Sequence, residues 1–155
     1  MARRIILFLT LFFVALTSGA AFTIWLDTNP DGVSPIFYAE KMQHAIRVFT
    51  VPLNTVAILS VIFTIASTFL ARRDRFSFYL LIGASICVAA AALITAFGNV
   101  PIINQIMTWS SNSPPSNWME VGEKWSRFQT ARTILQAAAL ACVILSTLFH
   151  RNHSK

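Results

Sequence analysis

Charged residues are scarce in this chain, and their scarcity is the first guide to its class. Only 12% of the 155 residues are charged, whereas 55% are hydrophobic and the mean hydropathy is +0.63. A soluble domain of this size carries about twice that charged fraction. The composition therefore indicates an integral membrane protein whose main surroundings are the lipid bilayer.

Cysteine pairs and metal-ligand clusters are also lacking. Cys87 and Cys142 lie deep within apolar runs and no C-x-x-C motif exists, so we expect buried free thiols rather than a thiol–disulfide enzyme. Glu40 and His44 have the i, i+4 spacing of a metal pair, but the sequence offers no third ligand. The other two histidines lie in the C-terminal tail, which excludes haem ligation by paired histidines. We predict neither a metal nor another cofactor.

Four apolar runs are each close to the ~20 residues that a helix needs to cross a hydrocarbon layer of ~30 Å. They span residues 5–26, 48–70, 76–97 and 128–149. Lipid cannot satisfy an open backbone, and the runs are too long and too continuously apolar for barrel strands. We predict an all-α fold, an integral membrane four-helix bundle, with residues 1–155 as a single domain.

The first apolar run has a second interpretation. The stretch MARRIILFLTLFFVALTSGAAF combines a basic start, an apolar core and the small residues SGA, as a cleavable signal peptide does. Apolar character continues through Leu26, however, which makes the run long enough to span the bilayer. We favour a retained helix over a cleaved signal.

Basic residues are divided unevenly between the two sides of the predicted bundle. The N-terminus, the connection after the second run and the tail hold seven basic residues against one acid. The other two connections, with their helix ends, hold five of each. The positive-inside rule then places both termini in the cytoplasm. We expect the protein itself in a plasma membrane or a bacterial inner membrane. The net charge of +6 is thus explained by topology and gives no support for nucleic-acid binding.

Polar residues line one arc of the helix that leads into the second run. At ~100° per residue, five of them fall within a narrow sector. They are Glu40, Gln43, His44, Arg47 and Asn54. Pro52 interrupts this helix near its outer end, where it frees a carbonyl and permits a kink. The arc predicts a polar path from the outer surface into the membrane, with Asn54 as its deepest member.

The start of the fourth run repeats this pattern. Its shared face, at i, i+4, i+7 and i+11, consists of Trp125, Gln129, Arg132 and Gln136. A cation at the depth of Arg132 is costly in lipid, so it should face the bundle interior or snorkel outward. A purely structural role is equally open, in which Arg132 pairs with Glu40 or Glu123.

The third run ends in TAFGNVP, where we expect Pro101 to end the helix after Thr95 and Asn99. All three elements reach the same membrane face and predict a polar pocket at the outer mouth of the bundle. Its expected members are His44, Arg47, Asn54, Asn99, Asn104, Trp125, Gln129 and Arg132. Residues 102–107 and the tryptophan-bearing loop would form its roof.

Each of these residues also has a structural interpretation. The asparagines at 54, 99 and 104 alternatively satisfy helix ends and the backbone groups that prolines free. Tryptophan is enriched at membrane interfaces for physical reasons, and we expect Trp25, Trp109 and Trp118 to lie there.

With NVPIINQ, followed some twenty residues later by W-x-x-x-Q-x-x-R, the chain resembles a known group. It is similar to the anthrone-oxygenase-like family of small four-helix membrane proteins. The residues that support the resemblance are Asn99, Pro101, Asn104, Trp125 and Arg132. The resemblance covers the last three helices and, more loosely, the whole chain.

This resemblance implies oxidation of anthrones to anthraquinones by molecular oxygen, without a metal or flavin. Such a site needs a base that forms the enolate and donors that stabilise its oxyanion. The resemblance then implies His44 as the base, Arg132 and Asn99 as the oxyanion donors, and Trp125 as a wall on which a flat substrate stacks.

Three classes of function stay open. The first is an oxygenase-like oxidoreductase on aromatic or quinone-type small molecules. The second is a non-catalytic binding or accessory protein, with a structural polar network or a site for a lipid-like molecule. The third, a small transporter or channel subunit, is disfavoured because the inner half of the bundle lacks polar residues. Polar groups converge from three helices, which favours a small-molecule site.

Overall fold

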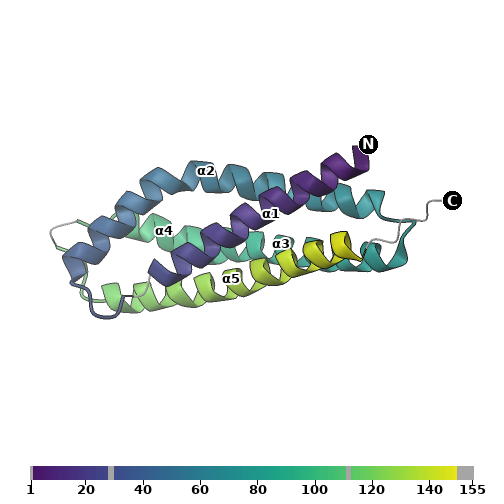
Figure 1. Cartoon of the computed structure of the whole chain (residues 1–155). Coiled ribbons are helices and arrows are strands. Elements are labelled where there is room, and N and C mark those ends of the chain that lie inside the picture. Colours follow the sequence, from purple (N-terminus) through teal and green to yellow (C-terminus); the bar gives the residue numbers. More distant parts are fainter. Residues whose placement is uncertain (1, 28–29, 111–112, 150–155) are drawn as a thin grey trace.

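The computed structural model describes residues 2–27, 30–110 and 113–149, and this part of the chain is helical with no strand. Its elements are α1 (Ala2–Asp27), α2 (Pro35–Leu70), α3 (Arg75–Ile94), the π-helix η1 (Thr95–Asn99), α4 (Val100–Met107) and α5 (Trp118–Leu148). Since α3, η1 and α4 follow one another without a break, the described residues contain four helices long and apolar enough to cross a membrane (Figure 1). The predicted all-helical fold with four candidate spans is confirmed.

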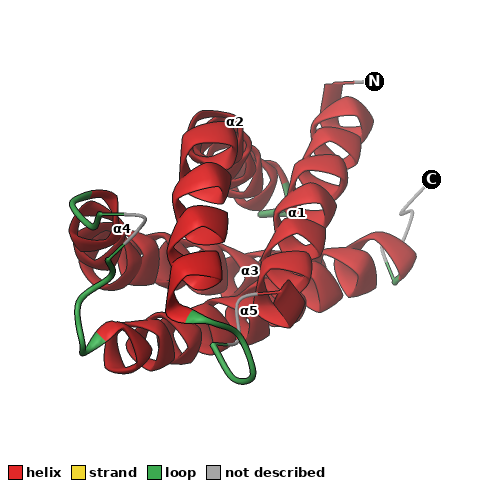
Figure 2. Ribbon diagram, turned by 90° about the vertical axis from the view of Figure 1, so that its left-hand side faces the viewer, coloured by secondary structure: helices red, strands yellow, loops and turns green. Residues whose placement is uncertain are grey.

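The four long helices form a closed ring. Both α1 and α3 pack against α2 and α5, so the order around the bundle is α1, α2, α3, α5. The start of α1 and the end of α5 lie at one end of the bundle, here called the termini end (Figure 1). The connections between α1 and α2 and between α4 and α5 lie at the opposite end, the loop end, which faces the viewer in Figure 2.

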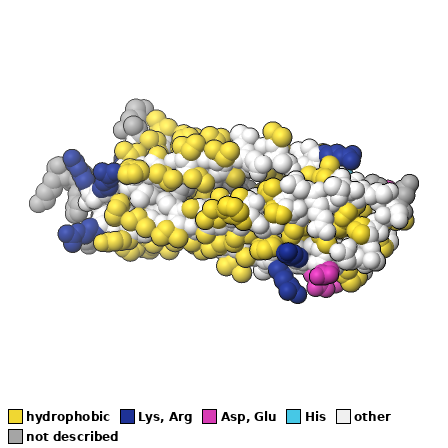
Figure 3. Space-filling model, turned by 180° about the vertical axis from the view of Figure 1, so that it is seen from behind, with side chains coloured by type: hydrophobic (Ala, Val, Ile, Leu, Met, Phe, Trp, Pro, Cys, Tyr) yellow, Lys and Arg dark blue, Asp and Glu magenta, His cyan; other side chains and the backbone are white. Residues whose placement is uncertain are grey.

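The surface of the bundle is that of a membrane protein. Large hydrophobic side chains such as Phe8, Ile58 and Leu93 remain exposed on the long helices. Hydrophobic side chains cover the middle of the molecule, and lysine and arginine side chains gather toward its ends (Figure 3). Water does not tolerate an apolar surface of this extent on a soluble monomer, whereas a bilayer requires it.

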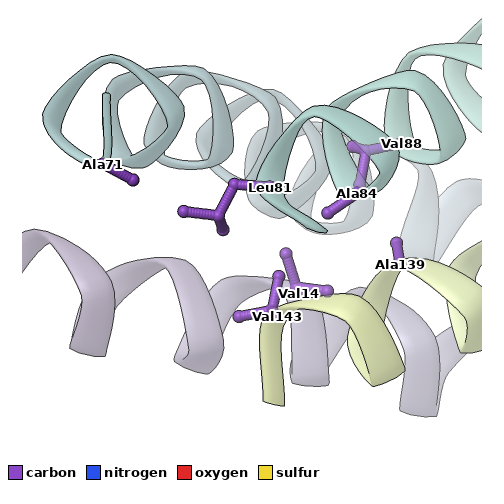
Figure 4. Packing of buried hydrophobic residues seen from close by; sticks show 7 residues of the cluster. All are labelled: Val14, Ala71, Leu81, Ala84, Val88, Ala139 and Val143. Carbon is purple, nitrogen blue, oxygen red and sulfur yellow. The ribbon is translucent and has the colours of Figure 1, made fainter. Parts of the chain in front are cut away.

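The interior toward the termini end is built from small and branched side chains. Val14, Leu81, Ala84, Ala139 and Val143 pack together with little or no exposure (Figure 4). Small residues let neighbouring backbones approach closely, which is how helices associate in lipid. Buried hydroxyls add bonds between helices here. One joins the Oγ1 of Thr10 on α1 to the Oγ of Ser67 on α2 at 2.7 Å.

The second helix begins earlier than the apolar run and does not stop at its proline. Ser34 caps its N-terminus by accepting a hydrogen bond from the backbone N–H of Phe37, and Pro35 occupies the first turn. The helix continues through Pro52 and is visibly bent (Figure 1). The Asp74 cap starts α3 directly after a tight turn, so α2 and α3 form an antiparallel hairpin.

The expected end of the third helix before Pro101 is wrong. The helix instead widens into η1, where the N–H of Val100 donates to the carbonyl of Thr95 five residues earlier. Pro101 then falls in the first turn of α4, where a missing N–H costs little. Wide π-turns of this kind occur frequently at functional sites.

A second apolar core fills the loop end because the third helix continues. Ile102 and Ile106 of α4 pack against Tyr38 and Met42 of α2 and a set of α5 side chains. That set is Trp118, Val121 and Trp125. Trp118 is therefore a core residue, only 8% exposed, and not a side chain that anchors the protein by facing lipid. Trp25 is exposed and donates from Nε1 to Thr130, in keeping with an interface.

Two further sequence predictions concern the cysteines and the tail. Both cysteines are free and partly buried, which agrees with the expectation of unpaired thiols. His150, His153 and the two basic residues of the tail lie outside the described residues.

Candidate functional site

A cavity of about 60 Å³ lies between the four long helices, below the loop-end core. Most of its wall is alanine, valine and leucine. Its polar lining residues are Thr17, Asn54, Ser60, Thr95, Arg132 and Gln136. The space accommodates a few water molecules or a small part of a larger ligand. Polar groups thus enter an otherwise apolar cavity from every long helix.

Among the described residues, Arg132 of α5 supplies the only charge on the cavity wall. Its Nη1 lies 3.5 Å from the Thr95 hydroxyl, and its buried Nε has no hydrogen-bond partner. Within the described part of the chain, no ion pair joins Arg132 to Glu123 or to Glu40, the two partners considered from the sequence. Glu123 instead pairs with Arg127, with 3.6 Å between Oε2 and Nη2. The guanidinium therefore lines the cavity without a carboxylate to neutralise it.

Gln136 and the hydroxyls around it complete the deeper wall. The Thr17 hydroxyl donates to Gln136 Oε1 at 3.1 Å, and Ser18 donates to the Gln136 backbone carbonyl at 3.0 Å. Gln136 was predicted on this face of its helix but without a role, and neither Thr17 nor Ser60 was predicted as a site residue. Thr17 lies seven residues after the buried Thr10, and Ser60 lies seven residues before the buried Ser67. This spacing places each pair on one helix face and identifies the inward faces of α1 and α2.

Three predicted site residues are fully or almost fully buried without lining the cavity, and one of them, Trp125, belongs to the loop-end core. Asn99, in η1, is 0% exposed, and neither its Nδ2 nor its Oδ1 has a partner. Gln129 donates from Nε2 to the Ala21 carbonyl at 2.8 Å, but its Oε1 is unpaired. Trp125 Nε1 is buried without an acceptor. A buried polar group that lacks its partner costs about 1–3 kcal/mol, so stability alone does not account for this set.

The remaining predicted residues divide between the cavity and the surface. Asn54 lines the cavity although it is exposed, whereas His44, Arg47 and Asn104 are exposed and do not line it. Ten residues separate His44 from Asn54, about 15 Å along the helix. The Glu40–His44 pair does not gain a third ligand, because the described residues contain no group of three metal-ligating side chains.

The structure divides the predicted pocket members into two groups. Ile102 and Ile106, expected in the roof, pack at the loop end because α4 prolongs the third helix. The cavity lies deeper. It brings together Asn54 and Arg132, with Asn99 and Gln129 buried in the neighbouring elements.

The fold and the site define a class: a small four-helix membrane protein whose interior holds an unneutralised cation beside an apolar cavity. Residues 42–142 match the sequence model of the family described as anthrone oxygenase, and the chain belongs to that family. The matched segment runs from α2 into α5 and includes Asn54, Asn99 and Arg132. No curated protein and no solved structure matches the chain.

Proposed function

We propose that this protein is a cofactor-independent, oxygenase-like enzyme that acts on aromatic or quinone-type small molecules. The observation that supports it most directly is the guanidinium of Arg132 on an apolar cavity wall without a carboxylate partner among the described residues. In a low-dielectric site such a cation stabilises a developing oxyanion far more than it does in water. Membership of the anthrone oxygenase family supports the same chemistry.

The reaction follows from what an oxyanion site does to an anthrone. Loss of a proton from the ring methylene gives an enolate, whose oxygen is held by the guanidinium of Arg132. The electron-rich carbon then passes electrons to O₂ and forms a C–O bond. The resulting peroxide loses water, so CH₂ and O₂ become C=O and H₂O. All electrons come from the substrate, so the sequence of steps needs no redox cofactor.

Buried residues outside the cavity wall bear on the rest of this substrate. The unpaired Nδ2 of Asn99, four residues from the cavity-lining Thr95, is a second donor for an oxygen. Trp125 packs in the loop-end core, so a substrate would stack on its indole only if that core opened. His44 is exposed and does not line the cavity, so we propose that the proton leaves to water rather than to this imidazole.

The test is oxidation of an anthrone by the purified protein in liposomes, followed by oxygen uptake and anthraquinone absorbance. Arg132→Met should lower the protein-dependent rate by about 100-fold, as loss of one oxyanion donor does. Arg127→Met removes an exposed cation of the same helix and should retain the rate. A wild-type rate equal to air oxidation across several anthrones would contradict the proposal. Equal losses in His44→Ala and Arg132→Met would assign the base to His44.

A second candidate is a non-catalytic protein that binds such molecules. Within the part of the chain that the structure describes, the cavity wall contains no aspartate, glutamate, histidine, lysine, tyrosine or cysteine, and hence no side chain suited to be a general base. For this candidate the same liposomes would bind an anthrone, with weaker binding in Arg132→Met, while oxygen uptake stays at the rate of empty liposomes.

A further inference from the structure

The seam between α2 and α3 leads directly to the cavity. At the termini end the two antiparallel helices touch, with the hydroxyls of Thr68 and Ser85 3.0 Å apart. Val61 lies seven residues before Thr68 on the same face of α2, and Ala92 lies seven residues after Ser85 on the same face of α3. Both line the cavity. The seam therefore passes from a closed contact to the cavity wall within two helical turns.

The cavity is exposed on this side of the bundle. Asn54 and Ala92 both line it and are both exposed, the first on α2 and the second on α3. Other parts of its wall are closed: Ser60 is 0%, Ala91 1% and Gln136 6% exposed. An opening between α2 and α3 explains why exposure is concentrated at these two residues.

Backbone irregularities coincide with the opening. Pro52 bends α2, and η1 widens the third helix, both beyond the Thr68–Ser85 contact. Closer to the loop end the seam closes again, because Gln43 Nε2 donates to the carbonyls of Ile106 at 3.0 Å and Trp109 at 2.9 Å. The opening is thus a window with a hydrogen-bonded contact at each end.

The surface around this window consists of large, exposed apolar side chains. Val51 and Ile58 flank Asn54 and are 74% and 60% exposed, while Leu93 and Phe97 beside Ala92 are 58% and 79% exposed. Side chains of this size and polarity face hydrocarbon in a membrane. A molecule that enters the window therefore arrives from the bilayer and not from water.

We infer that the window between α2 and α3 is a lateral portal through which a bilayer-dissolved ligand reaches Arg132. The ligand class, an uncharged lipophilic aromatic with an acidic enol or hydroxyl, rests on the proposed function. The portal itself does not, because it concerns access and not chemistry. An uncharged molecule partitions into lipid, and it meets the cation only after it has left the hydrocarbon.

Access is measured by thiol labelling in liposomes, with Cys87→Ala and Cys142→Ala as background. Ser60→Cys places a thiol on the cavity wall, and Ser67→Cys places one at an equally buried position seven residues away that does not line the cavity. The reagents are N-methylmaleimide, which enters the bilayer, and a sulfonated maleimide supplied on both sides. We expect N-methylmaleimide to label the first thiol at least tenfold faster than the second, and the sulfonated reagent to label neither.

The portal is then obstructed. Ala92→Phe adds bulk at the window, and Ala89→Phe adds it at an exposed position of α3 that does not line the cavity. We expect Ala92→Phe to slow labelling of Ser60→Cys at least tenfold and Ala89→Phe to leave it unchanged. Fast labelling by the sulfonated reagent, no difference between the two thiols, or an unaltered rate in Ala92→Phe would each overturn the portal. None of these outcomes depends on oxygenase activity, so the two proposals fail separately.

Discussion

Replacing Arg132 by methionine should make the protein more stable while it removes function. Arg132 lies five residues past the exposed Arg127, about 7 Å further into the apolar part of α5. An arginine at the centre of a membrane helix costs about 2.5–3.5 kcal/mol. At this shallower depth, with one hydrogen bond to Thr95, we assign about 1 kcal/mol to the cost. Methionine keeps most of the length of the side chain without the charge.

The assay uses the two free, partly buried thiols of Cys87 and Cys142 as reporters of unfolding. In detergent, a maleimide dye that fluoresces on reaction follows their exposure during heating. A gain of about 1 kcal/mol corresponds to about 2–4 °C in Tm for a chain of this size. Arg127→Met, which removes an exposed cation, should change the free energy of unfolding by less than about 0.5 kcal/mol.

The opposite sign refutes the reasoning. If Arg132→Met lowers Tm by several degrees while Arg127→Met does not, then Arg132 is a structural residue with a stabilising partner. That result would favour the non-catalytic interpretation with a structural polar network. A stabilised variant that has lost activity would instead identify Arg132 as a cation kept for its ligand at a cost in stability.

Three other substitutions test the fold around the site. Trp118→Ala should cost about 3 kcal/mol in thermal unfolding, because the indole is in the loop-end core, whereas an interfacial tryptophan would lose much less. Gly98→Val should cost about 1–3 kcal/mol, since a Cβ there lies 2.8 Å from the Phe128 ring; an unchanged Tm would show that the ring moves aside freely. Gln43→Leu removes the side-chain donor from the carbonyls of Ile106, which keeps the Trp109 N–H, and of Trp109. It should raise amide hydrogen exchange in α4, with exchange in α3 unaffected as the internal reference.

Helix number and length class followed from the sequence because the bilayer imposes a length of ~20 apolar residues on each span. The helix ends did not, since the first turns of α2 and α5 extend past the apolar runs with amphipathic sequence. Proline was the least informative residue. Pro52 lies inside a continuous helix and Pro101 follows a π-turn, and no local pattern distinguishes these cases from a helix end.

The sequence pointed to site residues whose polarity is unusual in an apolar run, and it did not point to those whose polarity is common there. Arg132 and Asn99 were selected as candidates because a cation or amide within an apolar run demands an explanation. Thr17 and Ser60 were missed because hydroxyls that bond back to their own helix look alike whether they face a cavity or lipid. The arc on α2 could not be resolved either. It straddles the edge of the buried face, so Gln43 is buried while its neighbour His44 is exposed.

The helices are longer than a bilayer is thick, and this has a consequence for how the protein folds. The 36 residues of α2 extend about 54 Å, against the ~30 Å of a hydrocarbon layer. We therefore expect the core around Tyr38 and Trp118 to stand toward the water, where the hydrophobic effect would drive it together. We expect the core around Leu81 and Val143 to lie in lipid, where only packing and hydrogen bonds would do so. One chain thus folds in two solvents. Urea should loosen the loop-end core while the helices in the membrane stay assembled.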